Sequence, residues 1–239
     1  MLRMQTRSFL GDPIVRAGWL LLLVALLWDL GGQDLAVMRW WGDAQGFGLR
    51  DNPWLAHYGH AVARRVLQGV LLVWLAVLAW GRGPVLGWQR RERLAVALAT
   101  VASLLVVSLI KRASLTSCPW DLAEFGGAAR YVSHWMLGVA DGGGAHCFPG
   151  GHASSALAFV GAALPALSAR RASPWRGTLL LLALLAGGAA LGVVQTLRGA
   201  HYPSHTLWTM VICYATSAVV WWVVHAWSAR RGWRAGLPA

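Results

Sequence analysis

Residues 177–197 read GTLLLLALLAGGAALGVVQTL, an apolar run with no charged side chain. A helix rises 1.5 Å per residue, so about 20 such residues cross the roughly 30 Å hydrocarbon core of a bilayer. Further apolar runs occur at residues 17–30, 66–80, 94–110, 153–167 and 206–227. The sequence therefore predicts an all-α polytopic membrane protein, in which residues 1–239 form a single domain with six transmembrane helices.

The composition excludes the main classes of water-soluble protein. Of the 239 residues, 57% are hydrophobic, 13% are charged and 16 are tryptophan, whereas about a quarter of a soluble domain is charged. The chain is too apolar to be disordered, and three cysteines are too few for a disulfide scaffold. A net charge of +12 is compatible with nucleic-acid binding, but arginine-rich cytoplasmic loops explain it better in a membrane protein. No nucleic-acid partner is expected.

Basic residues are distributed unequally between the two sides of the membrane. With six spans both ends of the chain share one side, and 13 of the 21 basic residues fall in segments on that side. These are Arg3, Arg7, Arg16, Arg82, Arg90, Arg91, Arg93, Arg170, Arg171, Arg176, Arg230, Arg231 and Arg234. The positive-inside rule then predicts cytoplasmic termini. With the compact size and the composition, this indicates a bacterial inner-membrane protein with residues 31–65, 111–152 and 198–203 at the periplasmic face.

The stretch before the second apolar run, residues 31–65, is rich in aromatic side chains. It contains Trp40, Trp41, Trp54, His57 and His60. Such residues concentrate at the headgroup level, so this stretch is expected to lie in the membrane interface. A role in gating the access of substrate is the alternative.

Three histidines are predicted to meet at one membrane face. His152 opens the fourth apolar run after a Pro-Gly-Gly turn, and His201 and His205 lie where the sixth run begins. Pro203 suits the first turn of that helix. The parity of the spans brings these ends to the periplasmic side. Ionisable groups at membrane depth are costly and usually functional, so the histidines indicate a site.

The only lysine among the 21 basic residues, Lys111, ends the third run beside Arg112. Chance in an arginine-biased composition is one explanation. The other is that an ammonium group faces a phosphate, with Arg198 and Arg112 supplying forked donors. Helix N-termini, cations and imidazoles on one face together describe a site for a phosphate ester.

The sequence lacks the residues that other mechanisms of phosphate chemistry require. The sequence has no carboxylate cluster for two metal ions, no glycine-rich Walker loop and no serine nucleophile elbow. What remains is attack on phosphorus by a neutral imidazole, protonation of the leaving oxygen by a second imidazole, and cations around the equatorial oxygens. No metal and no cofactor is expected. The reference pKa of imidazole, about 6.5, predicts that activity falls at acidic pH.

From Lys111 to His205 the sequence resembles the type 2 phosphatidic acid phosphatase superfamily, whose signature is K-x6-R-P, then P-S-G-H, then S-R-x5-H-x3-D. The matching stretches are Lys111-x6-Cys118-Pro119, Pro149-Gly150-Gly151-His152 and Arg198-Gly-Ala-His201-Tyr-Pro-Ser-His205. Their order, spacing and shared sidedness make the resemblance specific. It defines a motif core at residues 111–205 within a phosphatase-like domain.

The resemblance implies a metal-independent mechanism on a membrane lipid phosphate or diphosphate. His201 would form a phosphohistidine, and His152 would act as acid toward the leaving group and then as base for water. Lys111 and an arginine would hold the phosphate. Backbone N–H groups of the turn at Gly150 and Gly151 are expected to point at the anion.

Four positions depart from the signature. Cys118 stands in place of the family arginine, and Gly150 in place of the serine. Gln195 stands six residues before His201, where the family has its second arginine. Arg198 is therefore expected to take over the cationic role, with Gln195 as a helper.

The fourth departure is His205, which replaces the aspartate that orients the nucleophile. An aspartate fixes the tautomer of its imidazole and stabilises the imidazolium, whereas neutral His205 can only accept a hydrogen bond. Asp121 is the favoured substitute carboxylate, with Glu124 next. An alternative is that His201, His205, His152 and Asp121 hold zinc, because an H-x3-H pair has ligand spacing.

Cys118 and Cys147 lie beside the first two motifs on the predicted oxidising side. A disulfide between them would tie the two phosphate-binding segments together. Two unpaired buried thiols are the alternative, and the sequence does not choose between them.

The sequence thus predicts hydrolysis of a lipid phosphate at the periplasmic face. A lipid-to-lipid phosphotransferase would use the same phosphohistidine with a different acceptor. A non-catalytic lipid-binding or transport protein is the third alternative, and transport is disfavoured because the ionisable residues gather at one face.

Overall fold

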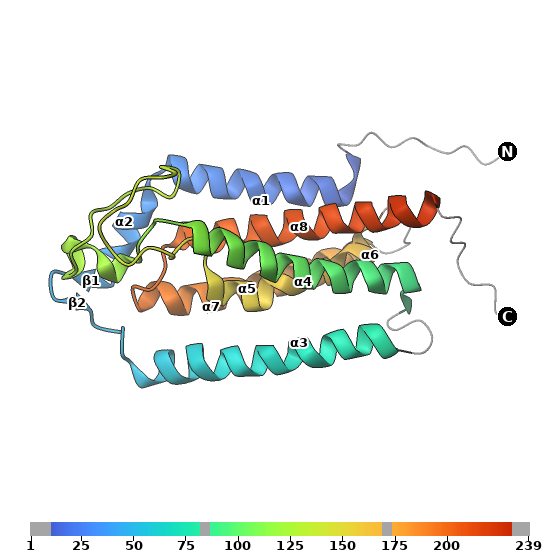
Figure 1. Ribbon diagram of the computed structural model, residues 1–239, viewed down its shortest axis with the longest axis horizontal. Helices are drawn as coiled ribbons and strands as arrows, with labels where there is room; N and C mark the ends of the chain where they lie inside the picture. Colours follow the sequence, from blue (N-terminus) through green and yellow to red (C-terminus); the bar gives the residue numbers. More distant parts are fainter. Residues whose placement is uncertain (1–10, 82–86, 169–173, 231–239) are drawn as a thin grey trace.

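The computed structural model describes residues 11–81, 87–168 and 174–230, and most of these are helical (Figure 1). The helices are α1 (Pro13–Leu30), α2 (Gln33–Met38), α3 (Ala63–Trp80), α4 (Arg90–Ala113), α5 (Gly151–Leu157), α6 (Leu164–Leu167), α7 (Pro174–Leu197) and α8 (Pro203–Arg230). A π-helix precedes α3 at Trp54–Val62, and 3₁₀ turns occupy Pro119–Asp121, Ala123–Phe125 and Ala158–Ala163. Two short strands, β1 (Gly42–Asp43) and β2 (Gly46–Phe47), form an antiparallel hairpin with Gly42 opposite Phe47.

Five helices of the described chain are long and apolar enough to cross a membrane, which confirms the predicted polytopic helical class. They are Pro13–Leu30, Trp54–Trp80, Arg90–Ala113, Trp175–Leu197 and Pro203–Arg230. The fourth predicted run is a shorter apolar segment, Gly151–Leu167, in which a 3₁₀ turn joins α5 to α6. The six-span count therefore rests on this shorter segment.

The short segment lies at the centre of the bundle. Leu157, Val160 and Ala163 are completely buried and share one core with side chains of α4, α7 and α8. Gly188 of α7 is needed for this packing, because a Cβ there would lie 2.4 Å from Leu157 Cδ2. Neighbouring helices, rather than lipid, thus cover much of its apolar surface.

The second membrane-crossing helix starts earlier than predicted. Oδ1 of Asn52 accepts hydrogen bonds from the backbone N–H groups of Trp54 (3.0 Å) and Leu55 (3.2 Å), which caps a helix at this point. The π-helix continues directly into α3. From Trp54 onward the stretch expected at the interface is thus part of the second membrane-crossing helix. Polar residues such as His60 and Arg64 had interrupted the apolar window although they are helical.

Both ends of the described chain lie at the same end of the bundle, where α1 begins and α8 ends (Figure 1). The helix starts that carry Arg16, Arg90 and Arg176 lie at this end as well. Other arginines used to predict sidedness lie outside the described residues, namely Arg3, Arg7, Arg82, Arg170, Arg171, Arg231 and Arg234.

The opposite end carries the hairpin and the long loop between α4 and α5 (Figure 1). A disulfide joins Cys118 to Cys147, which settles the alternative left open by the sequence. Asp141 accepts hydrogen bonds from Ser117 N (2.5 Å) and Ser117 Oγ (2.6 Å). An apolar cluster also ties the loop to the hairpin and to the start of α8, through Met38, Phe47, Leu122, Phe125, Ala129 and Tyr202. The loop is thus anchored over the helix ends.

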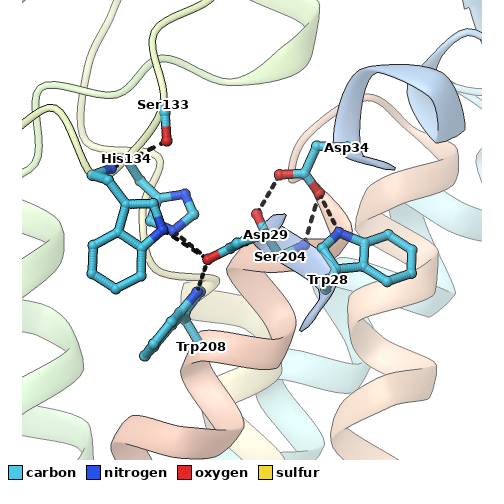
Figure 2. A network of polar contacts seen from close by, with 8 residues as sticks. Trp28, Asp29, Asp34, Ser133, His134, Ser204 and Trp208 are labelled. Carbon is cyan, nitrogen blue, oxygen red and sulfur yellow. Dashed lines mark hydrogen bonds and ion pairs between the residues drawn. The ribbon is translucent and has the colours of Figure 1, made fainter. Parts of the chain in front are cut away.

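Asp34 of α2 fastens the start of α8 (Figure 2). Its carboxylate accepts hydrogen bonds from Ser204 N (3.0 Å), from Ser204 Oγ and from Trp28 Nε1 (2.8 Å). Burial raises the pKa of Asp34, and the hydrogen bond from the Ser204 hydroxyl opposes that rise. An acidic group suits a helix N-terminus, because the free N–H groups there favour negative charge. This attachment fixes the helical turn that contains His205.

Candidate active site

A cavity of about 510 Å³ lies where α3, α4 and α5 meet the turn between α7 and α8. It brings together five of the predicted site residues, which come from distant parts of the chain: Lys111, Gly151, His152, Gln195 and His201. The fold therefore assembles one polar site from all three motifs.

Lys111 lies against the turn that opens α5. A Cβ on Gly151 would be 3.4 Å from Lys111 Cδ and 3.6 Å from Cε, so the lysine side chain runs directly over the glycine. Within the described residues, Lys111 takes no part in an ion pair. Its ammonium group is thus free to bind an anion in the cavity.

His152 lies in the first turn of α5 with one ring nitrogen engaged. Its Nε2 is 2.9 Å from the carbonyl oxygen of Gly59, and its ring centre is 4.6 Å from that of His60. A carbonyl only accepts hydrogen bonds, so Nε2 carries a proton. Nδ1 remains for chemistry in the cavity.

His201 lies in the turn between α7 and α8, held by a hydrogen bond from Thr196 Oγ1 to its carbonyl (3.1 Å). Its Nδ1 is 3.3 Å from Cys147 Sγ and 3.4 Å from His205 Nδ1. Burial lowers the pKa of His201 to about 3, and the positive charge of Lys111 acts in the same direction. The ring therefore stays neutral well below pH 6.5, which corrects the expectation that its protonation near that pH removes activity.

His205 is fully enclosed by aromatic rings behind His201. Phe148 and His134 approach it edge-on, with ring centres at 5.2 and 5.9 Å, and His134 stacks on Phe148 at 4.4 Å. Nε2 of His134 is 3.3 Å from Asp29 Oδ2 (Figure 2). Burial lowers the pKa of His134, and the charge of Asp29 opposes this.

Asp29 is held in place by two tryptophans. Its Oδ2 accepts hydrogen bonds from Trp135 Nε1 (2.8 Å) and from Trp208 Nε1 (2.7 Å). Figure 2 labels Asp29 and Trp208. The end of α1 thereby supports the residues that pack around His205. The sequence analysis did not include Asp29, Asp34 or His134 in the site, because only the fold brings them close to it.

Two predicted cations lie outside the cavity lining. Arg198 donates from Nε to the carbonyl of Arg50 (2.9 Å) and from Nη1 to Gln195 Oε1 (3.3 Å). Arg112 is exposed at the end of α4. Arg198 is thus already engaged with neutral protein groups, which weakens its expected role as the main phosphate-binding arginine.

Gly150 and Asp121 also form hydrogen bonds with other groups than the sequence predicts. The Gly150 N–H donates to Thr209 Oγ1 (2.9 Å), so it does not point at an anion in the cavity. The Asp121 carboxylate accepts from the Cys118 N–H (3.2 Å) and caps the turn that follows the cysteine. Among the described residues, His205 rather than Asp121 lies beside His201 Nδ1.

Gln195 has an unused donor. The residue is only 3% exposed and its Oε1 accepts from Arg198, while its Nε2 has no partner among the described residues. An unsatisfied buried donor is costly unless something binds it. Because Gln195 lines the cavity, a bound phosphate oxygen is a suitable partner.

His60, Arg64 and Gln68 line the cavity and were missed by the sequence analysis. They come from the π-helix and α3. Their spacing of four residues places them on one helix face, which is a signal the sequence contains. The signal was missed because the helix begins at Trp54, before the predicted apolar run at residues 66–80.

The predicted zinc alternative does not fit the donor set. The described groups close enough to share an ion are Cys118, Cys147 and His201, with donor atoms within 4.8 Å of one another. Two of the three are the sulfurs of the disulfide, and a cysteine sulfur binds zinc only as a thiolate. His152 and Asp121 do not belong to this group.

Comparison with known proteins identifies the family. Residues 93–229 match the model of the PAP2 superfamily, over more than half of the chain and across all three motifs. No curated protein and no solved structure matches the chain. The chain therefore belongs to the PAP2 superfamily of type 2 phosphatidic acid phosphatases, whose members hydrolyse phosphate esters.

Proposed function

We propose that the protein hydrolyses a lipid phosphate or diphosphate through a phosphohistidine on His201, at the periplasmic face of a bacterial inner membrane. One observation carries the proposal: His152, His201 and Lys111 line a single cavity. Family membership supports phosphate ester hydrolysis. The apolar helices around the cavity support a lipid substrate.

The first step transfers the phosphoryl group to His201. If Nδ1 of His201 donates its hydrogen to Nδ1 of His205, the lone pair is on Nε2. Nε2 attacks phosphorus, and the P–N bond forms as the bond from phosphorus to the lipid oxygen breaks. Lys111 and the free Nε2 of Gln195 stabilise the charge on the phosphoryl oxygens.

His152 supplies the proton for the leaving lipid oxygen. Because its Nε2–H is held by the Gly59 carbonyl, the doubly protonated ring donates from Nδ1. Water then attacks phosphorus and gives a proton back to Nδ1. The P–N bond breaks, inorganic phosphate leaves, and His201 returns to its neutral form.

The periplasmic orientation rests on three features. The disulfide suits an oxidising compartment, arginines gather at the other end of the bundle, and the described chain begins and ends there. A reporter domain that folds only in the periplasm tests this when it is fused to the C-terminus. We expect no reporter activity there, and strong activity would reverse the orientation.

A phosphate-release assay in detergent tests the function. The panel contains an isoprenyl diphosphate, phosphatidylglycerol phosphate, phosphatidate and a lipid A-like glycolipid. We expect His201→Ala and His152→Ala each to lower the rate by at least about 1,000-fold. His57→Ala is the control, because His57 is exposed on the π-helix Trp54–Val62 and does not line the cavity. Full activity in both cavity variants would contradict the proposal.

The same assay in ¹⁸O-labelled water identifies the acceptor. Hydrolysis places one labelled oxygen in each inorganic phosphate. Transfer of phosphate to a second lipid without labelled phosphate would show the phosphotransferase reaction instead.

A further inference from the structure

The cavity lacks both of the arginines that its family signature provides. Cys118 occupies the first position and is committed to the disulfide, and the second position is Gln195. Arg198 is engaged by Arg50 and Gln195 outside the lining. A phosphate group carries up to two negative charges, so one lysine leaves it only partly neutralised.

We propose that Arg64 of α3 is the phosphate-binding arginine of this protein and replaces the missing cations of the signature. The inference rests on the proposed function, because it concerns the same cavity. Arg64 and Lys111 are the cations among the described residues that line it. They come from different helices, α3 and α4.

The polar residues of the cavity wall lie nearer the loop end of the bundle than the apolar ones. Three segments each place a polar residue and an apolar residue seven positions apart on the cavity wall: Arg64 and Leu71 of α3, Lys111 and Leu104 of α4, and His152 of α5 with Phe159 of the following 3₁₀ turn. Seven residues are two turns, or about 10 Å. The helix directions in Figure 1 put all three apolar members on the side away from the loop end.

This layering gives the cavity a polar part toward the loop end and an apolar part toward the opposite end of the bundle. Arg64 lies one helical turn beyond His60, whose ring centre is 4.6 Å from that of His152, so it belongs to the polar part. An amphiphile whose hydrocarbon chain begins directly below its phosphate fits this arrangement. Arg64 would then contact the phosphoryl oxygens while Leu71 and Phe159 contact the chain.

The charge of Arg64 is uncompensated among the described residues. No described carboxylate pairs with it, and its charge acts on both His60 and His152. An anion bound between positive groups lowers the electrostatic repulsion across the cavity. The planar guanidinium also offers two parallel donors, which a single lysine does not.

Binding of inorganic phosphate and orthovanadate to the purified protein tests the inference without turnover. The readout is the ligand concentration that half-saturates the rise in thermal midpoint. We expect Arg64→Gln to raise this concentration about 10- to 100-fold, the range for a lost charge-assisted hydrogen bond. Arg64→Lys should fall between Arg64→Gln and the unmodified protein, because it retains charge but not the fork.

Arg65→Gln is the matched control, because Arg65 is the exposed neighbour of Arg64 and lies outside the cavity lining. It should bind both anions as the unmodified protein does. Equal affinities in Arg64→Gln and Arg65→Gln would overturn the inference. An unchanged thermal midpoint of the ligand-free variants shows that folding is intact.

Turnover separates this inference from the proposed function. With an active lipid, Arg64→Gln should lower kcat/KM by a similar factor, whereas His201→Ala abolishes phosphate release. If no panel lipid is hydrolysed by the unmodified protein, the proposed function fails. The anion affinities still decide the role of Arg64 in that case.

Discussion

Nδ1 of His201 lies 3.4 Å from Nδ1 of His205, where the family signature places an aspartate. One imidazole thus faces another at the position that normally supplies a negative charge. His205 can accept one hydrogen bond and so fix the tautomer of His201. This contact supplies no negative charge, and behind it the carboxylate of Asp29 lies 3.3 Å from His134 Nε2.

Variants of His205 test whether it orients His201. His205→Asn keeps an acceptor for the His201 Nδ1–H and should retain much of the activity. His205→Leu fills similar space without an acceptor and should lower kcat by at least about 100-fold, since the wrong tautomer costs that much or more in triads. The measurement is phosphate release with a KM determination. Equal rates in the two variants would show that His205 acts only by packing.

The disulfide should stabilise both the fold and the nucleophile. It closes a loop with a sequence separation of 29, for which chain entropy predicts about 3.6 kcal/mol. Cys147 Sγ also lies 3.3 Å from His201 Nδ1, so Cys118→Ser with Cys147→Ser should lower both the thermal midpoint and kcat.

Thiol labelling supplies the chemical control for this prediction. In denaturant a maleimide should modify only Cys213 before reduction and all three cysteines after it. Cys213→Ala should keep activity, because Cys213 lies within α8 and outside the cavity lining. Three labelled cysteines without reductant would contradict the pairing.

The neutral state of His201 predicts a loss of stability in acid. In the unfolded chain the ring takes up a proton below pH 6.5, whereas the pKa of about 3 keeps it neutral in the folded protein. Unfolding therefore binds a proton between these values, and stability falls as the pH drops. Between pH 7 and pH 5 this amounts to about 2 kcal/mol.

His201→Gln is the reference for that measurement. It lacks the titrating ring, so its unfolding free energy in detergent should decline less over the same pH interval. Parallel curves for the two proteins would mean that His201 is not buried as a neutral ring.

Asp34 should be essential for the start of α8. Its carboxylate receives hydrogen bonds from Ser204 and Trp28, and Asp34→Ala would leave these donors unpaired in a buried site. We expect a loss of about 2–4 kcal/mol in unfolding free energy, with Asp34→Asn less affected. Asp51→Ala, at an exposed position, is the control. A midpoint of Asp34→Ala equal to that of the control would remove this role.

The apolar runs predicted the long helices well, because membrane spans are set by composition. The runs at residues 94–110, 177–197 and 206–227 lie within α4, α7 and α8. The motif spacing likewise predicted that Lys111 and His201 share a cavity.

Residues whose role depends on tertiary contacts could not be predicted from apolar runs and motif spacing. Asp121 was chosen because it lies close to Cys118 in sequence, yet its carboxylate caps a local turn. Arg64 was overlooked because polar residues in the first turns of a span lower its apparent hydropathy. Only the packing of α3 against α4 and α5 shows that its polar face lines the site.

The most direct test of the account is to trap the covalent intermediate. The active protein is mixed with a ³²P-labelled lipid phosphate, quenched in alkali within milliseconds, digested and analysed by mass spectrometry. We predict an alkali-stable, acid-labile phosphate on the peptide that carries His201, and none in His201→Ala. Rapid turnover without label on that histidine, or label on another residue, would contradict it.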